Sequence, residues 1–271
     1  MRSTTAGAIV ALALSFGIAR SAAANPRVLP FSYPYETLTK GTFEMEQFVD
    51  ATPSVALSTS TGQPASLLLF NFTTEFEYGI TDRLELGLYF QIAPSPGDGF
   101  SGAGAIDFSG AKQRLRYRIG REGLLPLEIS VYGELTETER EIEIEAKLNL
   151  QKRFGNFRLI SNLWAEYEIY FDGRREWVLN PTLGATYEVN PMFSAGVESW
   201  MRVEFPDPTP TVPRVFALGP HAFVGPTAMV NFGKLWWSAG LYFRVTDTAR
   251  AVAPGDTFGR IWVRSVVGLD I

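Results

Sequence analysis

The sequence contains no cysteine and a single histidine, His221. Without cysteine the chain forms no disulfide framework and has no thiolate metal site or thiol nucleophile, and one histidine excludes a multi-histidine metal centre. Only 20% of the residues are charged and the formal net charge is −5, so the chain lacks the basic surface that binds nucleic acid. We therefore expect no cofactor, no metal ion and no nucleic-acid partner.

Long hydrophobic runs are also missing, except near the N-terminus. Arg2 is followed by an uncharged apolar stretch over residues 7–19 and by the small residues Ala22-Ala23-Ala24. This order is typical of a secretory signal peptide, and the apolar stretch is too short to span the bilayer as a permanent transmembrane helix. We predict a signal peptide over residues 1–24, cleaved after Ala24; the alternative is an N-terminal anchor helix.

The rest of the chain alternates between apolar and polar residues. Between positions 84 and 92, for example, leucine, phenylalanine and isoleucine occupy every even position. A period of two predicts β-strands with one apolar face. We count twelve such runs, at about 41–50, 66–78, 84–94, 105–119, 126–136, 141–152, 157–171, 177–189, 193–205, 215–232, 235–246 and 258–271.

The connections between these runs alternate between short turns and longer loops. Residues 79–83, 120–125, 153–156, 190–192 and 233–234 are short, whereas 51–65, 95–104, 206–214 and 247–256 are longer. An even number of strands with this alternation is the pattern of outer-membrane barrels. We predict an all-β fold, an antiparallel up-and-down transmembrane β-barrel of about twelve strands over residues 41–271. Residues 25–40, with Pro26, Pro30 and Pro34, are expected as an extended periplasmic lead-in.

A soluble barrel or sandwich would also have one apolar face, but strand length and aromatic position favour the membrane. The runs reach the roughly 9–11 residues of a tilted membrane strand and exceed the ~5–6 of a typical soluble one. Aromatic residues at membrane interfaces form two girdles around an aliphatic band. One predicted girdle lies beside the short turns and contains Tyr78, Tyr117, Tyr187, Phe193 and Phe232. The other lies beside the long loops and contains Phe70, Phe90, Phe171, Trp177 and Phe243.

If the apolar faces contact lipid, the polar faces line the lumen. One strand then carries a basic ladder of four side chains up the interior wall: Lys112, Arg114, Arg116 and Arg118. We expect Glu85 on one side of the ladder and Glu128 and Glu134 on the other. Further round the wall we expect Glu75, Glu77, Glu143, Glu145, Glu166 and Glu168. The ladder either provides a field that orients a polar or anionic solute, or closes the lumen through salt bridges.

The last five strands predict a different wall of the lumen. Aromatic side chains of inward parity occur here among inward glycines: Trp200, Phe223, Trp236, Tyr242 and Trp262. The glycines of this parity are Gly184, Gly196, Gly225, Gly240 and Gly268. Either the small residues leave room for a solute that slides along the rings, or the glycines permit strand coiling and the rings fill the space.

An outer-membrane lipid hydrolase is the enzymatic alternative, because the outer-membrane phospholipase also has twelve strands. Such an enzyme needs a serine beside a histidine. His221 is the sole candidate base, and Ser199 and Ser238 are the nearest serines on the neighbouring strands. Ser238 has inward parity but lies near the opposite end of the barrel from His221. We therefore predict no catalytic residues and no enzymatic activity.

Three segments carry a resemblance to a known group of proteins. They are Tyr35–Val49 (YETLTKGTFEMEQFV), Thr74–Leu86 (TEFEYGITDRLEL), and Phe223–Pro226 (FVGP) followed by Trp236-Trp237. They resemble largely uncharacterised proteobacterial outer-membrane β-barrel proteins, loosely related to the transporter-like proteins of the meta-pathway of phenol degradation. The resemblance implies passage of small, often aromatic, molecules. The terminal Ile271 departs from the Phe or Trp that usually ends such barrels.

These observations predict a monomeric barrel in the outer membrane, surrounded by lipid and inserted by the barrel-assembly machinery. The expected function is a channel for small solutes, which are anionic or aromatic on this interpretation, through a charged lumen. The alternatives are a closed structural or surface-interaction barrel without transport and, third, the lipid hydrolase.

Overall fold

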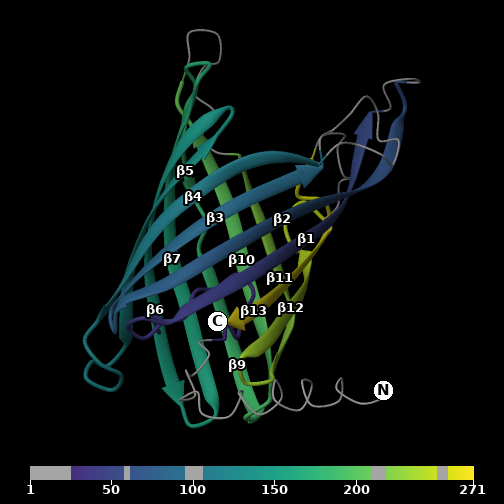
Figure 1. Ribbon diagram of the computed structural model, residues 1–271. Coiled ribbons are helices and arrows are strands. Elements are labelled where there is room, and N and C mark those ends of the chain that lie inside the picture. The colour runs from purple at the N-terminus through teal and green to yellow at the C-terminus, as the bar shows by residue number, and fades with distance from the viewer. Residues whose placement is uncertain (1–25, 58–61, 95–105, 209–217, 249–255) are drawn as a thin grey trace, which may run out of the picture.

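The computed structural model describes residues 26–57, 62–94, 106–208, 218–248 and 256–271. In these residues thirteen strands form one antiparallel sheet, and β1 pairs with both β2 and β13, so the sheet closes into a barrel (Figure 1). No helix of the described residues is long and apolar enough to cross a membrane. The strands are β1 (Phe43–Leu57), β2 (Pro64–Thr81), β3 (Leu84–Pro94), β4 (Ile106–Ile119), β5 (Glu128–Thr138), β6 (Glu141–Phe154), β7 (Phe157–Tyr170), β8 (Arg175–Leu179), β9 (Thr182–Asn190), β10 (Phe193–Pro206), β11 (Leu218–Asn231), β12 (Leu235–Arg244) and β13 (Ile261–Asp270).

The thirteen strands occupy the twelve positions that the sequence predicts. Strands β8 and β9 both pair with β7 on one side and β10 on the other, so they are two halves of one strand. The interruption falls at Asn180-Pro181, where proline has no N–H to donate to the ladder. Asn180 N still donates to Trp164 O (3.0 Å) and Met201 N to Pro181 O (3.1 Å), which keeps the wall continuous. The prediction of an antiparallel twelve-strand barrel is confirmed.

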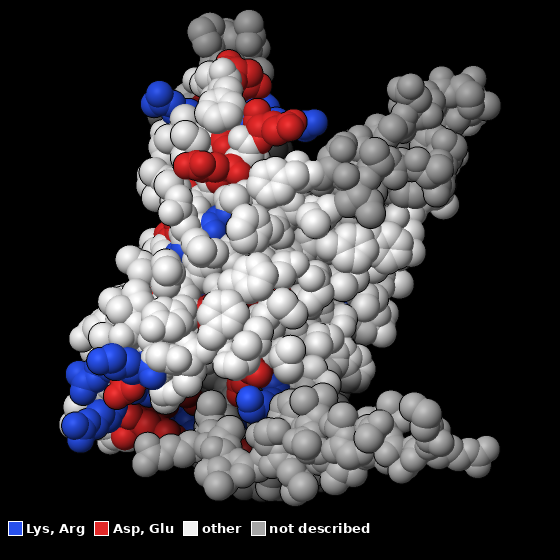
Figure 2. Space-filling model, viewed as in Figure 1, with Lys and Arg blue, Asp and Glu red and all other residues white. Residues whose placement is uncertain are grey.

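The outer face of the barrel is apolar, as the alternation predicts. Large aliphatic side chains of most strands are exposed on it, Leu115 at 50% and Leu163 at 53% among them. All ten predicted girdle aromatics are also exposed, from Phe193 at 36% to Phe171 at 64%. Figure 2 shows a broad band without charge between two ends where charged side chains gather. This surface matches the lipid-facing band of a membrane barrel.

Two predictions concern residues outside the described part of the chain. The predicted signal peptide, residues 1–24, lies there in full, and so do parts of the four longer loops. The described chain begins at Pro26, two residues after the predicted cleavage position.

Residues 26–40, which we call the lumen segment, correct one expectation. The sequence predicted an extended periplasmic lead-in; the segment is extended, but the structure places most of it inside the barrel, with Leu29 0%, Tyr35 1% and Leu38 3% exposed. The prolines keep the segment extended and without internal ladder bonds. The barrel wall therefore has to supply partners for its backbone.

Side chains of four different strands bind the backbone of the lumen segment. Glu198 accepts from the N–H groups of Phe31 (3.2 Å) and Ser32 (2.7 Å). Asn162 accepts from Tyr33 N (2.7 Å) and donates to Tyr33 O (3.0 Å). Two further acceptors complete the set, Gln151 for Tyr35 N (3.2 Å) and Glu85 for Leu38 N (2.7 Å).

A glycine makes the close approach of the lumen segment possible. A Cβ atom at Gly184 would lie 2.4 Å from Leu29 Cδ1, so a side chain there would force the Leu29 side chain to move. The inward glycine therefore makes room for Leu29 of the chain itself.

The lipid-facing assignment predicts the cost of a charge on the outer face. Leu163 lies near the middle of β7, so Leu163→Arg should lower the free energy of unfolding by about 2–4 kcal/mol, because an arginine near the bilayer midplane is desolvated. Leu124, 69% exposed in the turn before β5, provides the control, and Leu124→Arg should cost about 0–1 kcal/mol. Equilibrium unfolding in lipid vesicles measures both. Equal costs for the two variants would contradict the assignment.

Candidate functional site

The predicted basic ladder lies on the inner face of β4, and Arg114 is its most buried member, at 1% exposure. Its Nη2 atom lies 2.6 Å from Glu75 Oε1 and its Nη1 atom 2.6 Å from Glu85 Oε1, and Nη2 also contacts Glu77. The side chain crosses Gly87 on the neighbouring strand, where a Cβ would lie 2.5 Å from Arg114 Nε. Arg114 therefore reaches carboxylates two strands away on β2.

Of the other three ladder residues, Arg116 shares Glu85 with Arg114, and Lys112 and Arg118 have partners of their own. Lys112 Nζ lies 2.9 Å from Glu134 Oε1, and Arg116 Nη2 donates to Glu85 Oε2 (2.9 Å). Arg118 lies at the short-turn end and donates to the carbonyl oxygen of Asp82 (2.7 Å). The predicted partners Glu85 and Glu134 thus both contact the ladder.

Four other predicted acidic residues have different neighbours. Glu128 is 5% exposed and lies opposite Gln151 in the sheet, and among the described residues no ion pair joins it to a ladder cation. Glu145 pairs with Lys147 (2.6 Å). Glu166 and Glu168 pair with Arg202, at 2.9 and 2.6 Å.

Two arginines that the sequence analysis did not single out belong to this site. Arg202 on β10 uses all three of its side-chain nitrogens, the third on Glu204 at 2.7 Å. Arg27 of the lumen segment pairs with Glu46 (2.8 Å) and Glu75 (3.3 Å). The alternation of β10 could have found Arg202, because it shares the inward parity of Trp200. Arg27 lies outside any strand and gave no such signal.

Four of the five predicted aromatic residues surround Phe31 of the lumen segment. Phe31 stacks on Trp200 at 4.7 Å between ring centroids, and Trp200 stacks on Phe223 at 4.3 Å. Tyr242 lies 5.1 Å and Trp262 6.2 Å from Phe31, both edge-on. The rings fill this wall around a side chain of the protein itself.

The fifth ring, Trp236, lies in a separate cluster with Phe48 and Val266. Its Nε1 donates to Glu44 Oε1 (2.6 Å), and its ring covers Gly268, where a Cβ would lie 2.1 Å away. At Gly268, as at Gly184, the glycine accommodates a neighbouring side chain, which agrees with the filled-wall alternative.

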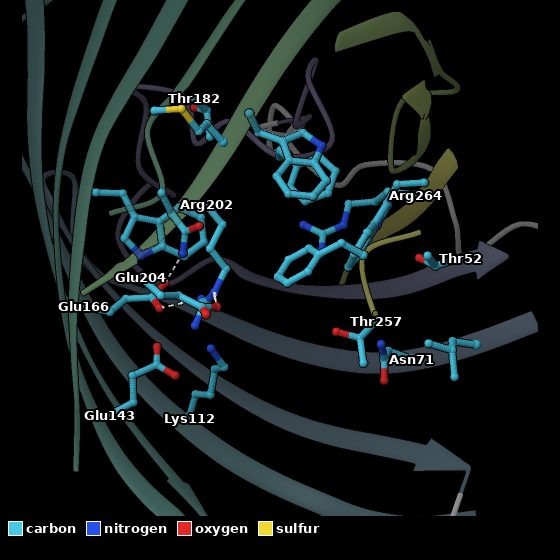
Figure 3. Close-up of a pocket in the computed structure, with 18 of the residues that line it drawn as sticks. Thr52, Asn71, Lys112, Glu143, Glu166, Thr182, Arg202, Glu204, Thr257 and Arg264 are labelled. Atoms are coloured by element: carbon cyan, nitrogen blue, oxygen red, sulfur yellow. Dashed lines mark hydrogen bonds and ion pairs between the residues drawn. The ribbon is translucent and has the colours of Figure 1, made fainter. Parts of the chain in front are cut away.

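A cavity of about 700 Å³ lies between the charged and the aromatic walls, on the long-loop side of the lumen segment. Figure 3 shows Lys112, Glu143, Glu166 and Arg202 on one side of it and Arg264 on the other. A recess of about 110 Å³ shares Phe31, Lys112, Trp164 and Arg264 with the cavity and reaches Arg27. The remaining lining of the cavity comprises Thr52, Leu69, Phe70, Asn71, Asn180, Thr182, Trp200, Met201, Glu204, Thr257, Phe258 and Trp262.

The loop before β13 contributes Thr257 and Phe258 to this cavity and is held by Asp256. Partial burial raises the pKa of the Asp256 carboxyl, but hydrogen bonds from Arg244 and from Phe258 N outweigh it, so the pKa lies below its ordinary value. Arg244 Nη1 lies 2.7 Å from Asp256 Oδ2. The carboxylate form therefore anchors this side of the cavity at neutral pH.

Three groups of carboxylates are close enough together to suggest metal binding. They are Glu46, Glu75 and Glu77; Glu134, Glu143 and Glu145; and Glu143, Glu166 and Glu168. Each group is contacted by cations of the chain: Arg27 and Arg114, Lys112 and Lys147, and Arg202 respectively. The geometry of the carboxylates is thus accounted for by ion pairs within the protein.

The contacts of His221 differ from those of a catalytic base. Its Nδ1 lies 2.7 Å from Arg244 Nη2, and its ring stacks on Phe258 at 4.3 Å. Ser199 donates to Leu183 O, and Ser238 is opposite Val266 and Met229 in the sheet. Neither serine forms the nucleophile–base pair that a lipid hydrolase requires.

No protein-family model and no curated protein sequence matches the chain. The structure is similar to an outer-membrane channel of Pseudomonas putida F1, with 13% sequence identity, a TM-score of 0.62, and 92% of this chain and 100% of that chain covered. The chain has the fold of an outer-membrane β-barrel. A monoaromatic hydrocarbon channel variant, TodX, is more distant, at 10% identity and a TM-score of 0.47 over 85% of this chain and 90% of the other. At these identities the similarity describes the barrel fold alone, and the link to phenol degradation stays a prediction.

The ion pairs of this outer-membrane barrel predict that Arg114 stabilises it. Arg114→Gln should lower the free energy of unfolding by about 3–5 kcal/mol, because it leaves three buried glutamates with one fewer cation. Arg118→Gln is the matched control on the same strand and should cost about 1 kcal/mol, because Arg118 is half-buried at the short-turn end and donates to a carbonyl oxygen and not to a carboxylate. The loss of heat-modifiable migration with rising urea concentration measures both. Equal midpoints for the two variants would contradict the role of Arg114.

Proposed function

We propose that this outer-membrane barrel is a channel for small solutes and that the lumen segment sets the width of its path. One observation carries the proposal: the lumen has cavities on both sides of the lumen segment. The 700 Å³ cavity lies on the long-loop side, and a cavity of about 310 Å³ lies at the short-turn end. Pro26 and Val28 of the lumen segment belong to the lining of the second cavity. Movement of this one segment would join the two cavities.

The lining of the path supports a polar or aromatic solute. Half-buried rings of Trp262 and Phe258 face the larger cavity beside threonine and asparagine side chains. The ladder cations are all engaged in contacts with the protein, so they leave no free positive field for an anion. The aromatic part of the predicted solute class therefore has more support than the anionic part.

A closed structural barrel is the second candidate, and a specific observation favours it. Glu198, Asn162, Gln151 and Glu85 hold the lumen segment by hydrogen bonds across the full width of the lumen. A segment with so many buried partners is costly to displace, because each buried group left without a partner costs about 1–3 kcal/mol.

The cellular setting of the channel is part of the proposal. The apolar band supports an outer-membrane location, with lipid around a monomer and insertion by the barrel-assembly machinery. Export by residues 1–24, with cleavage near Ala24, is the expectation from the sequence.

Conductance of the refolded protein in a planar bilayer tests the channel. The unmodified protein should give discrete current steps. Asn162→Ala should increase the conductance or the open time, because it removes both hydrogen bonds to Tyr33 and so loosens the lumen segment. Asn149 is an equally buried asparagine on β6 that hydrogen-bonds Ser130, so Asn149→Ala should leave the steps unchanged.

The outcome also separates the two candidates. Silence from folded, heat-modifiable protein, in the unmodified form and in Asn162→Ala alike, would support the closed barrel and reject the channel. Equal changes in the two asparagine variants would show that the lumen segment is not the element that controls the path.

A further inference from the structure

The cations that line the larger cavity are each matched or outnumbered by carboxylates. Lys112 pairs with Glu134, and Arg264 binds both oxygens of Asp50 at 2.7 Å. Arg202 alone pairs with three carboxylates, those of Glu166, Glu168 and Glu204. The neighbouring Lys147–Glu145 pair is balanced. The cavity and its immediate surroundings therefore contain more carboxylates than lysine and arginine side chains, a net negative formal charge.

Glu143 on β6 adds a further carboxylate to this cavity. Its oxygen atoms lie within 4.8 Å of those of Glu166 and Glu168 on one side and of Glu134 and Glu145 on the other. In the part of the chain that the structure describes, no lysine or arginine forms an ion pair with it. Figure 3 shows Glu143 beside Lys112 at the edge of the cavity, below Glu166. A carboxylate placed between four others attracts a cation.

Glu145 provides a second, independent indication, that of a missing hydrogen-bond donor. Its side chain lines the recess below the cavity and is nearly fully buried, and its Oε2 atom has no hydrogen-bond partner. A buried carboxylate oxygen without a donor is costly. A ligand that brings an N–H group to this edge of the cavity would remove that cost.

The aromatic rings around the cavity already accept cations on their faces. The Arg264 guanidinium carbon lies 3.8 Å from the centroid of Phe31, and Lys147 Nζ lies 3.6 Å from that of Trp164. Trp262 and Phe258 present further ring surface to the same cavity. A positive group over a ring face is attracted by the ring quadrupole, most strongly over tryptophan.

We propose that this cavity binds a small organic cation: an ammonium or guanidinium group on an aromatic or alkyl body. The positive group lies at Glu143, and the body packs against the rings of Trp164 and Trp262. The volume of about 700 Å³ suits a ligand of this size. The inference rests on the proposed channel function, since it names the class of solute that the path selects.

An inorganic cation or an anion fits the same cavity less well. Each of the three side-chain nitrogens of Arg202 already donates to a glutamate, so carboxylates match its charge and disfavour an anion beside it. The aromatic surface has no role in either case.

Isothermal titration calorimetry on the refolded full chain in detergent tests the inference, with three probes of one shape. They are 2-phenylethylammonium, 3-phenylpropanoate and the neutral 2-phenylethanol. The ammonium should bind most tightly of the three. Glu143→Gln should weaken its binding about tenfold, the usual size of a lost charge-assisted hydrogen bond.

Glu137 provides the matched control. It lies on β5, the strand next to β6, and its exposed side chain faces away from the lumen. Glu137→Gln removes the same charge and should leave the binding of 2-phenylethylammonium unchanged.

Several outcomes would overturn the inference. Binding of the carboxylate at least as tight as that of the ammonium would reject a cation site. Displacement of the ammonium by stoichiometric Ca²⁺ or Mg²⁺ would identify a metal site in its place. Equal weakening by Glu143→Gln and Glu137→Gln would show a general surface-charge effect. The probe comparison uses the unmodified protein, so it decides the question even if Glu143→Gln does not fold.

Failure of this inference and failure of the channel are distinguishable. Calorimetry in detergent measures binding without conduction, and the planar bilayer measures conduction without a ligand. Tight binding of 2-phenylethylammonium without current steps in the bilayer would reject the channel and support the cation site. Current steps that 2-phenylethylammonium neither blocks nor shifts, together with no heat of binding, keep the channel and reject the site.

Discussion

The structure depends on neutralising the charges that the barrel encloses. Lipid covers the outer face, so most of the ionisable side chains of the strands point into a narrow lumen. There the cost of desolvation is offset only by close partners. Arg114 is an example, since its one guanidinium group forms ion pairs with glutamates on β2 and β3 at the same time. The lumen segment extends this network, because Arg27 brings a further cation to Glu46 and Glu75.

The lumen is divided by chemistry into two walls. Ion pairs dominate β2 to β7, whereas the rings of Trp200, Phe223, Tyr242 and Trp262 dominate β10 to β13. The cavity lies where the two walls meet, and Arg264 belongs to both, because it binds Asp50 and covers Phe31. A solute in this cavity is therefore offered carboxylates on one side and aromatic rings on the other. This combination is the basis of both proposals.

In the proposed channel, the lumen segment links the stability of the barrel to its permeability. Its backbone N–H groups donate hydrogen bonds to carboxylates of the barrel wall, such as those of Glu198 and Glu85. The buried carboxylates and the segment therefore stabilise each other. The same contacts separate the cavity at the long loops from that at the short turns. The attachment is noncovalent and consists of individual hydrogen bonds and ion pairs.

The sequence by itself determined the strands, their inward and outward faces and both aromatic girdles, because alternation with a period of two is a local property that lipid on one side makes strict. Inward parity was also enough to identify the ladder and to bring Glu85 and Glu134 into contact with it. Only the tertiary structure decided the rest. Arg114 reaches across Gly87 to a strand further away, which depends on how far a long side chain extends over the curved wall. Residues 26–40 form no strand and have no periodicity, so their position in the lumen depends on partners such as Glu198 and Asn162, which lie more than a hundred residues away in the chain.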